Sequence, residues 1–318
     1  MDERCVTGLE AVPAAARSGV LTIGNFDGVH VGHRRIIAMA RERADADGCP
    51  VVAMTFDPPP DLVLRPADAP ERLTPAAVRA ALLREAGCDW VVTARADPAL
   101  LGLTPEAFVE QVIVARFAPR YMVEGPNFRF GRQRGGDVDF LAREGARRGF
   151  DVRVAEPVRL AVAGEERVIS STLIRRLVAE GDVSAAARCL TRAFTLHGQV
   201  VPGEGIGRTL GRPTANLSPG EQVCPGEGVY AGRARVSGRE YAAAVSVGTR
   251  PTFTAGDPAG RVIEAYLLDA SGDFYGRRMA LSFVRRLRAQ RRYDGPAALQ
   301  AQMARDVENV RAALADGG

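Results

Sequence analysis

The sequence predicts two domains: an α/β domain built on a parallel sheet, and an antiparallel β-barrel or sandwich that a C-terminal helix covers. Up to about Gly181, apolar strands alternate with amphipathic helices, which is typical of a parallel sheet covered on both faces. Over residues 194–287, short strands rich in glycine, valine and aromatic residues alternate with turns, which favours a barrel or a sandwich. At 318 residues, the chain is long enough for two hydrophobic cores.

The elements of the first domain follow from their apolar patterns. Strands are expected over residues 20–26, 51–56, 90–93 and 120–124, and helices over 33–46 and 75–86. A further helix begins after Thr104, which caps it, with Pro105 at its first position. Ligands of open parallel sheets bind beyond the carboxyl ends of the strands, so the polar loops that follow these strands are the candidate sites.

The segment GNFDGVHVGH, residues 24–33, combines a strand end, a glycine turn and two of the three histidines. If a helix starts near Val31, His30 and His33 project from one side of its first turn. A helix N-terminus suits a phosphate, and the imidazoles can donate hydrogen bonds to it, which predicts a nucleotide site. The alternative is a helix start with its histidines in solvent.

Two later segments of the first domain allow both a binding and a structural interpretation. In NFRFG, Asn127 and Arg129 alternate with two phenylalanines, so the loop either presents a polar side to a ligand or is a hairpin-like loop with a buried aromatic pair. In ISSTLIR, residues 169–175, the hydroxyl groups either cap a helix that stops at Gly181 or contact triphosphate oxygens together with Arg175.

A helical connector over residues 182–192 leads to the barrel. Its strands are expected over residues 195–201, 228–236, 241–247, 262–268 and 279–284. The closing helix begins near Pro296, and one apolar stripe should cover the barrel: Leu299, Met303, Val307 and Val310.

Two features of the barrel sequence suggest chemistry. In the glycine-rich loop expected over residues 203–217, Thr214 and Asn216 supply neutral oxygens of the kind that bind magnesium or a phosphate, although such glycines are also typical of plain turns. Glu264 is the one carboxylate in an apolar strand, so it is either a solvated side chain or a buried base.

The composition excludes several functions. All 42 basic residues are arginine, so neither a Walker-type phosphate loop nor Schiff-base catalysis is available, because both need lysine. The net charge of +4 fits an anionic substrate or a nucleic acid equally well. Five scattered cysteines without a CxxC pair predict reduced thiols. With no apolar signal core or membrane-spanning run, we expect a cytoplasmic protein with no membrane partner.

Taken together, the motifs resemble the bacterial bifunctional riboflavin kinase/FAD synthetase (FMN adenylyltransferase) family over nearly the whole chain. The resemblance rests on GNFDGVHVGH, TFDP, NFRFG, ISSTLIR, GRTLGRPTAN, GVY, VGTRPTF and EAYLLD…DFYG, in this order. It implies a Rossmann-like nucleotidyltransferase domain over residues 1–182, a helical linker over 183–193 and a riboflavin kinase barrel over 194–318.

The resemblance also implies the reactions and their participants. Riboflavin is phosphorylated by ATP to FMN, and FMN is then adenylylated by ATP to FAD with release of pyrophosphate. Mg²⁺ is the expected cofactor, and riboflavin, FMN, FAD and ATP are the expected partners. We expect no nucleic-acid partner, and a monomer or a weak homo-oligomer.

Site residues follow from the resemblance position by position. The catalytic residues would be His30 and His33 in the first domain and Glu264, as the general base, in the barrel. The ATP and FMN site would comprise Gly24, Asn25, Phe26, Asp27, Gly28, Asn127, Ser171, Thr172 and Arg175. The ATP and flavin site of the kinase would comprise Gly205, Gly207, Arg208, Gly211, Pro213, Thr214 and Asn216, of which Thr214 and Asn216 would bind Mg²⁺.

One departure from the family pattern concerns the adenylyltransferase half. Pro59 stands where the family usually has a histidine, and proline can neither donate a hydrogen bond nor transfer a proton. We therefore expect a weaker hold on the substrate phosphates. An alternative is a riboflavin kinase whose N-terminal domain only binds nucleotide. Another is a non-catalytic flavin- or nucleic-acid-binding regulator, which the arginine-rich residues 285–292 alone suggest, although such runs are usually solvated.

Overall fold

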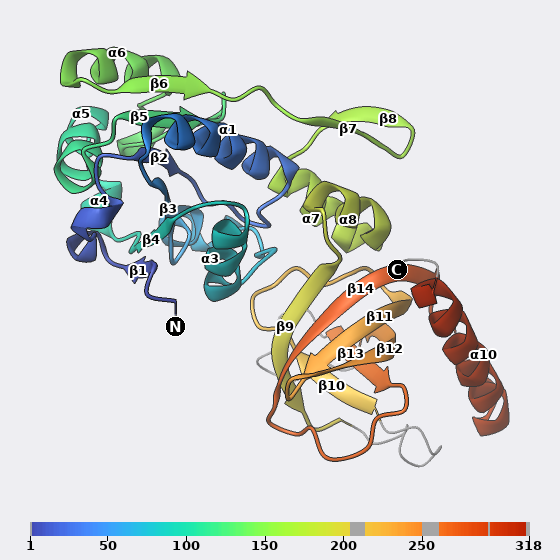
Figure 1. Ribbon diagram of the computed structural model, residues 1–318. Coiled ribbons are helices and arrows are strands. Elements are labelled where there is room, and N and C mark those ends of the chain that lie inside the picture. The colour runs from blue at the N-terminus through green and yellow to red at the C-terminus, as the bar shows by residue number, and fades with distance from the viewer. Residues whose placement is uncertain (1, 204–213, 250–260, 292, 316–318) are drawn as a thin grey trace. The chain divides into compact units, whose positions relative to one another are not determined.

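The computed structural model describes residues 2–203, 214–249, 261–291 and 293–315 (Figure 1). These residues form two compact units. The first contains residues up to 70 and residues 75–170, and the second contains residues 71–74 and those from 171 onward.

The first unit is built on a six-stranded parallel sheet in the order β1-β4-β3-β2-β5-β6. The strands are β1 (Cys5–Thr7), β2 (Val20–Ile23), β3 (Val51–Phe56), β4 (Trp90–Ala94), β5 (Tyr121–Glu124) and β6 (Asp151–Val154). The strand expected to reach Phe26 ends at Ile23. Phe26 itself cannot be part of a strand, because its φ angle is +46°. Since β3 and β5 lie on opposite sides of β2, the order of the sheet reverses between β2 and β5.

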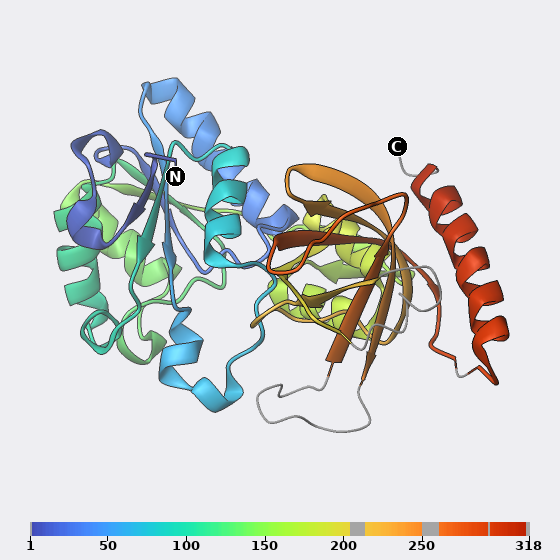
Figure 2. The same cartoon turned by 90° about the horizontal axis from the view of Figure 1, so that it is seen from below.

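Helices cover both faces of this sheet, as expected (Figure 2). α1 (Val31–Asp47) and α3 (Ala76–Glu85) pack on one face. On the other lie α6 (Val138–Arg148) and α5 (Pro105–Phe108), which continues as a π-helix over Val109–Phe117. Thr104 caps α5 by accepting a hydrogen bond from Ala107 N at 3.2 Å, as predicted. Shorter elements are α2 (Pro60–Leu64), α4 (Pro98–Leu101) and the hairpin of β7 (Arg159–Val162) and β8 (Glu165–Val168).

The second unit begins with α7 (Ser171–Glu180) and α8 (Val183–Leu190), which lead into a closed barrel of six antiparallel strands in the order β10-β13-β12-β11-β14-β9. The strands are β9 (Phe194–Val201), β10 (Thr214–Ser218), β11 (Gly228–Val236), β12 (Arg239–Thr249), β13 (Arg261–Leu267) and β14 (Arg278–Arg288). Residues 214–217, expected to lie in a loop, belong to β10, so that expectation is wrong. Polar and apolar residues alternate over residues 214–217, which is the pattern of a strand. The prediction missed this pattern because the glycines before it are typical of a loop.

The closing helix α10 (Pro296–Ala315) lies along the outside of the barrel (Figure 1). Val310 and Ala313 of α10 pack with Ala231 and Leu268 in one buried cluster. The predicted stripe is confirmed for Val310 and for the partly buried Val307, which pack against the outer surface of the barrel. Leu299 and Met303 line a cavity instead. Residues 71–74 also belong to this unit, because Arg72 exchanges backbone hydrogen bonds with Glu221 and Val223.

Candidate active sites

The loop after β2 has an unusual backbone. Phe26, Gly28 and Val29 have φ angles of +46°, +85° and +42°, which is uncommon for phenylalanine and disfavoured for a β-branched valine. Hydrogen bonds hold this conformation: Gly24 N donates to Met54 O at 3.0 Å, and Val29 N donates to Phe26 O at 3.0 Å. Strained backbone of this kind concentrates at functional sites, where the surrounding structure fixes it.

The two histidines at the start of α1 lie together, as predicted. Their rings stack with centroids 3.7 Å apart, and the ring of Phe26 meets His33 edge-on at 5.3 Å. His30 is the N-cap of α1, and its Nδ1 accepts a hydrogen bond from Gly32 N at 3.1 Å. Gly32 allows this contact, because a Cβ there would lie 3.1 Å from His30 Cε1. In the neutral ring, His30 therefore bears its proton on Nε2, so Nε2 is the hydrogen-bond donor of this side chain.

His33 is held neutral by its surroundings. Burial keeps the pKa of His33 well below its usual range, and repulsion from His30, when that ring is protonated, lowers it further. Its Nδ1 is buried and has no hydrogen-bond partner among the described residues. An arriving phosphate would supply both a partner and a negative charge. The pair is therefore suited to bind an anionic group at the N-terminus of α1.

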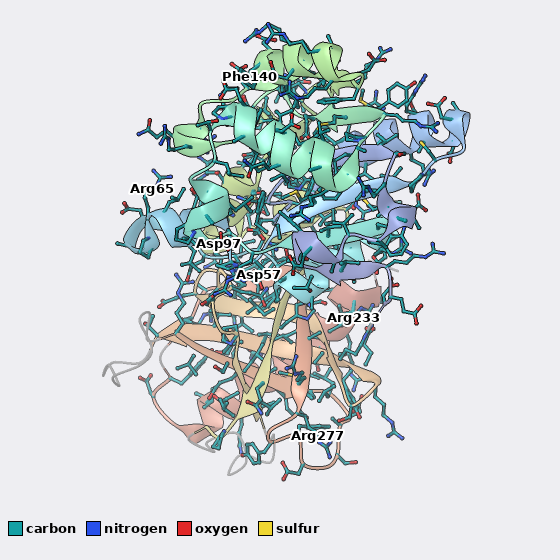
Figure 3. The ribbon with its side chains drawn as sticks, turned by 90° about the vertical axis from the view of Figure 1, so that its left-hand side faces the viewer. Asp57, Arg65, Asp97, Phe140, Arg233 and Arg277 are labelled. Carbon is teal, nitrogen blue, oxygen red and sulfur yellow. The ribbon has the colours of Figure 1, made fainter. Side chains whose placement is uncertain are left out.

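The loops that follow β3 and β4 lie beside this one. Ile23 pairs with Met54, and Phe56 pairs with Ala94, so the three strands end at the same edge of the sheet. Figure 3 labels Asp57 and Asp97 in the loops after β3 and β4. Pro58 and Pro59 follow Asp57, and Pro59 is the N-cap of α2. The proline run thus leaves the sheet next to the histidine loop.

The NFRFG loop follows β5 and shows the expected alternation. Asn127 and Arg129 are exposed, whereas Phe128 and Phe130 stack at 5.4 Å and pack into the core. Phe130 also lies 6.0 Å from Phe140 of α6, which Figure 3 labels. The aromatic pair is therefore structural, and the polar side is the part that can meet a ligand.

The ISSTLIR segment crosses the boundary between the two units. α7 begins at Ser171 and ends before Gly181, as expected, and Arg175 Nε donates to Glu71 O at 2.7 Å. Ser171, Thr172 and Arg175 are thus counted with the second unit, and their grouping with the histidines stays a prediction. Ile169 belongs to the first unit and lies next to the start of α1. If Gly32 carried a Cβ, that atom would lie 3.7 Å from the carbonyl oxygen of Ile169.

In the barrel, strand register brings the candidate side chains onto one face. Asn216 of β10 lies opposite Glu264 of β13, and Thr214 lies opposite Tyr266. Residues directly opposite each other in neighbouring strands share a face of the sheet. Ala265, between Glu264 and Tyr266, is fully buried on the other face, inside the barrel. Thr214, Asn216 and Glu264 therefore share the face of the sheet opposite to Ala265, and these three residues line two cavities.

The two cavities meet at Thr214, which lines both. We call them the Asn216 cavity, of about 380 Å³, and the Glu264 cavity, of about 330 Å³. The Asn216 cavity is bounded by Val200, Gly203, Leu267 and residues 270–275. The Glu264 cavity lies between the strands and α10, whose Leu299, Met303 and Asp306 line it. Glu264 is half-buried in this cavity, which is the environment of a candidate base rather than of a fully solvated side chain.

Asn216 has the character of a ligand-binding residue. It is 7% exposed, and its Oδ1 has no hydrogen-bond partner among the described residues. Gly203, the first glycine of the expected glycine-rich loop, lies so close that a Cβ there would overlap the Asn216 amide. A buried, unpaired acceptor is costly unless a ligand or cation satisfies it. Five other predicted kinase residues lie outside the described residues: Gly205, Gly207, Arg208, Gly211 and Pro213.

Sequence reasoning missed an ion pair in the wall of the Glu264 cavity. Arg288 donates from Nε and Nη2 to the two carboxylate oxygens of Asp306, at 3.0 and 2.6 Å. The Arg288 and Asp306 side chains are only 15% and 6% exposed, so Arg288 departs from the solvated role expected for residues 285–292. The sequence did contain a sign of this ion pair. Asp306 lies on the same face of the closing helix as Met303 and Val310, and a carboxylate within an apolar stripe indicates a buried partner.

Comparison with known proteins identifies both units. The family model described as FAD synthetase matches residues 12–173, and that described as riboflavin kinase matches residues 190–314. The chain is 36% identical to the bifunctional riboflavin kinase/FMN adenylyltransferase of Pseudomonas fluorescens and 35% identical to that of Escherichia coli K12. The first alignment covers 98% of this chain and 97% of the relative, and the second covers 97% of each.

A solved structure shares the fold over almost the full length. It is titled a macrolide-efflux protein from Streptococcus pneumoniae, and it matches with a TM-score of 0.85 and 26% identity, covering 97% of this chain and 99% of its own. In the described part of the present chain, none of the helices combines the length and the apolar content needed to cross a membrane.

Proposed function

The chain belongs to the bifunctional riboflavin kinase/FMN adenylyltransferase family, and from this premise we propose how its residues divide the two reactions. It is an enzyme that phosphorylates riboflavin with ATP and then transfers an adenylyl group from ATP to FMN. Because models for both domains match, the two-step function is favoured over a kinase with a degenerate N-terminal domain. We assign adenylyl transfer to residues 1–182, the linker to residues 183–193 and the kinase to residues 194–318.

For the adenylyltransferase, the observation that supports the proposal most is the stacked pair His30–His33 at the N-terminus of α1. The loop over residues 24–28 would hold ATP against this helix end. An oxygen of the FMN phosphate attacks the α-phosphorus, and the bond to pyrophosphate breaks. His30 donates from Nε2 to the phosphate oxygens on which negative charge accumulates, and Asn127, Ser171, Thr172 and Arg175 would bind the nucleotide and its phosphates. No covalent enzyme intermediate is needed, so catalysis consists of positioning and charge stabilisation.

For the kinase, we propose that ATP occupies the Asn216 cavity and riboflavin the Glu264 cavity. Thr214 lines both cavities, which supports transfer of the γ-phosphoryl group past this residue. Glu264 takes the proton of the ribityl hydroxyl as its oxygen attacks the γ-phosphorus and ADP leaves. The general base and the phosphate-binding oxygens are then on adjacent strands, in fixed register.

The Thr214 and Asn216 oxygens fit a magnesium ion. Magnesium prefers oxygen ligands and accepts neutral ones beside substrate phosphates, and the unpaired Asn216 Oδ1 is such an oxygen. When bound, the ion would offset charge on the transferred phosphoryl group. We propose that Mg²⁺ accompanies ATP here, and that the enzyme acts in the cytoplasm as a monomer or a weak homo-oligomer, without nucleic acid or a membrane.

The test is a product analysis with the purified full-length chain. Protein, ATP and magnesium are incubated with riboflavin in one reaction and with FMN in another, and riboflavin, FMN and FAD are separated by chromatography. FAD from both starting compounds is the expected result. FMN that accumulates without FAD would contradict the adenylyltransferase assignment, and the absence of FMN from riboflavin would contradict the kinase assignment.

A further inference from the structure

Glu124 is a buried carboxyl group that the assignments above leave without a role. It is the last residue of β5 and is 2% exposed, directly after the fully buried Met122 and Val123. Burying a carboxyl group in an apolar strand costs free energy unless it is hydrogen-bonded, so its presence at this position requires an explanation.

The Glu124 side chain replaces a missing backbone bond between two strands. Backbone pairing of β2 with β5 stops at Leu21 and Met122. Beyond that point, Ile23 N donates to Glu124 Oε1 at 2.8 Å. The backbone of Glu124 still pairs with β6, since its carbonyl oxygen accepts from Ala155 N at 2.8 Å. β2 and β5 therefore separate at their carboxyl ends, and the carboxyl group of Glu124 bridges the gap.

This separation lies at the reversal point of the sheet. The chain continues from β2 to β3 on one side, and β5 lies on the other side. In open α/β sheets, ligands bind outside the carboxyl ends of the strands at such a point. Ile23 directly precedes Gly24, so the amide that Glu124 holds is the last one before the loop over residues 24–28.

We propose that Glu124 is a positioning residue for the adenylyltransferase: its carboxyl group spans the gap between β2 and β5 and fixes the start of the loop that binds ATP. The inference rests on the proposed location of the ATP site at that loop. Glu124 acts on substrate only through Ile23 and the loop, by accepting the Ile23 hydrogen bond.

The environment of Glu124 favours the neutral form of this group. Burial raises the pKa of Glu124 well above its usual range, and the hydrogen bond from Ile23 N opposes this only in part. A neutral carboxyl group near a triphosphate avoids the repulsion that a carboxylate would add. What matters for positioning is then an uncharged acceptor at the right distance, and a glutamine amide supplies the same acceptor.

The test compares Glu124→Gln with Glu124→Leu in the full-length enzyme. For FAD formation from FMN, we expect Glu124→Gln to keep kcat near the wild-type value. Glu124→Leu should lower kcat about tenfold, the effect of losing one buried hydrogen bond of about 1.4 kcal/mol. Riboflavin phosphorylation by the same preparations should be unchanged. Wild-type kcat and ATP KM in Glu124→Leu would overturn the proposal, and so would an equal loss of kcat in both variants.

Glu144→Leu is the matched control. Glu144 is also a buried carboxyl group of the first unit, 6% exposed, but it lies on α6 and pairs with Arg147 and Arg148. We expect this variant to lose stability and to keep the wild-type kcat for FAD formation. If Glu124→Leu does not fold, Glu124→Asp replaces it, because a side chain one methylene shorter cannot reach Ile23 N and should lower kcat in the same way.

Amide hydrogen exchange tests the positioning role without relying on catalysis. In Glu124→Leu or Glu124→Asp, the amides of residues 23–28 should exchange about tenfold faster or more, while those of β3 should not change. Unchanged exchange at residues 23–28 would overturn the proposal. If the wild-type enzyme makes no FAD, the proposed ATP site fails, and this measurement still decides what Glu124 does.

Discussion

The two units use different parts of the chain to build their sites. In the first unit, the candidate groups follow the ends of parallel strands, where backbone conformation and a helix N-terminus define the site. In the barrel, Thr214, Asn216 and Glu264 lie on the strands themselves, and cross-strand register aligns them. The first site should therefore depend most on loop geometry and helix capping, and the second on the chemical identity of single side chains.

Replacing Glu264 should have the largest effect of these substitutions on enzyme activity. Glu264→Gln keeps the size of the side chain but cannot accept a proton, so kcat for riboflavin phosphorylation should fall about 100-fold or more. FAD formation from FMN should not change. As a control, Glu240→Gln alters an exposed carboxylate of β12 that pairs with Arg233 and Arg235, and both reactions should continue. Normal FMN formation by Glu264→Gln would remove the general-base role.

His30→Asn separates helix capping from phosphate binding. Asparagine is a preferred N-cap, so α1 should remain capped at Gly32 N while the imidazole is lost. We expect FAD formation from FMN to slow about 100-fold, which is the usual effect of removing one hydrogen-bond donor to the transition state. Riboflavin phosphorylation should not change. The matched control is His197→Asn, which alters the histidine of β9. Full FAD synthesis by His30→Asn would mean that His30 only caps the helix.

The lowered pKa of His33 predicts a pH-dependent stability of the first unit. Between the folded pKa and about 6.5, the unfolded chain binds more protons, so the free energy of unfolding falls as the pH falls. Relative to His33→Asn, the wild type should lose about 1 kcal/mol or more between pH 7.5 and 5.5. The single tryptophan, Trp90 of β4, reports on this unit by fluorescence during denaturant unfolding. Parallel pH dependence of the two proteins would contradict a neutral His33.

Pro59→His should give the smallest effect, and it is the only one expected to increase activity. A histidine here adds a hydrogen-bond donor beside the loop over residues 24–28, and one bond of about 1 kcal/mol corresponds to a rise of about fivefold in the rate of FAD formation at low ATP. Pro60→His, one position along, is the control and should leave the rate unchanged. An unaltered rate in Pro59→His would show that the proline is not a handicap.

The sequence predicted best what local pattern determines. The capping by Thr104 and the histidine pair on the first turn of α1 involve residues a few positions apart, so periodicity was sufficient. The expectation of reduced thiols rested on spacing, and the structure has five free cysteines, with burial raising the pKa of Cys88 to about 12.

What the sequence could not predict depends on contacts between distant residues. The pairing of Arg288 with Asp306 joins a strand to a helix, and Glu124 bonds to Ile23 across two strands that are far apart in the chain. Whether Glu264 is solvated or enclosed depends on α10, which no strand pattern reveals. The edge strand β6 was not predicted, because its exposed, charged residues lack the apolar pattern of a strand.

The short segment over residues 71–74 determines how the enzyme can be divided experimentally. It is counted with the barrel unit, while its neighbours Pro70 and Pro75 are counted with the first unit, so the chain passes between the units three times. Gln222, which is 3% exposed, donates to Leu73 O at 3.0 Å within this segment. Gln222 also donates to Thr195 O at 3.1 Å, which a recombinant fragment starting at the linker would keep. Such a fragment would lose the Leu73 acceptor and both backbone bonds of Arg72, so we expect the isolated barrel to be less stable than the barrel in the full chain.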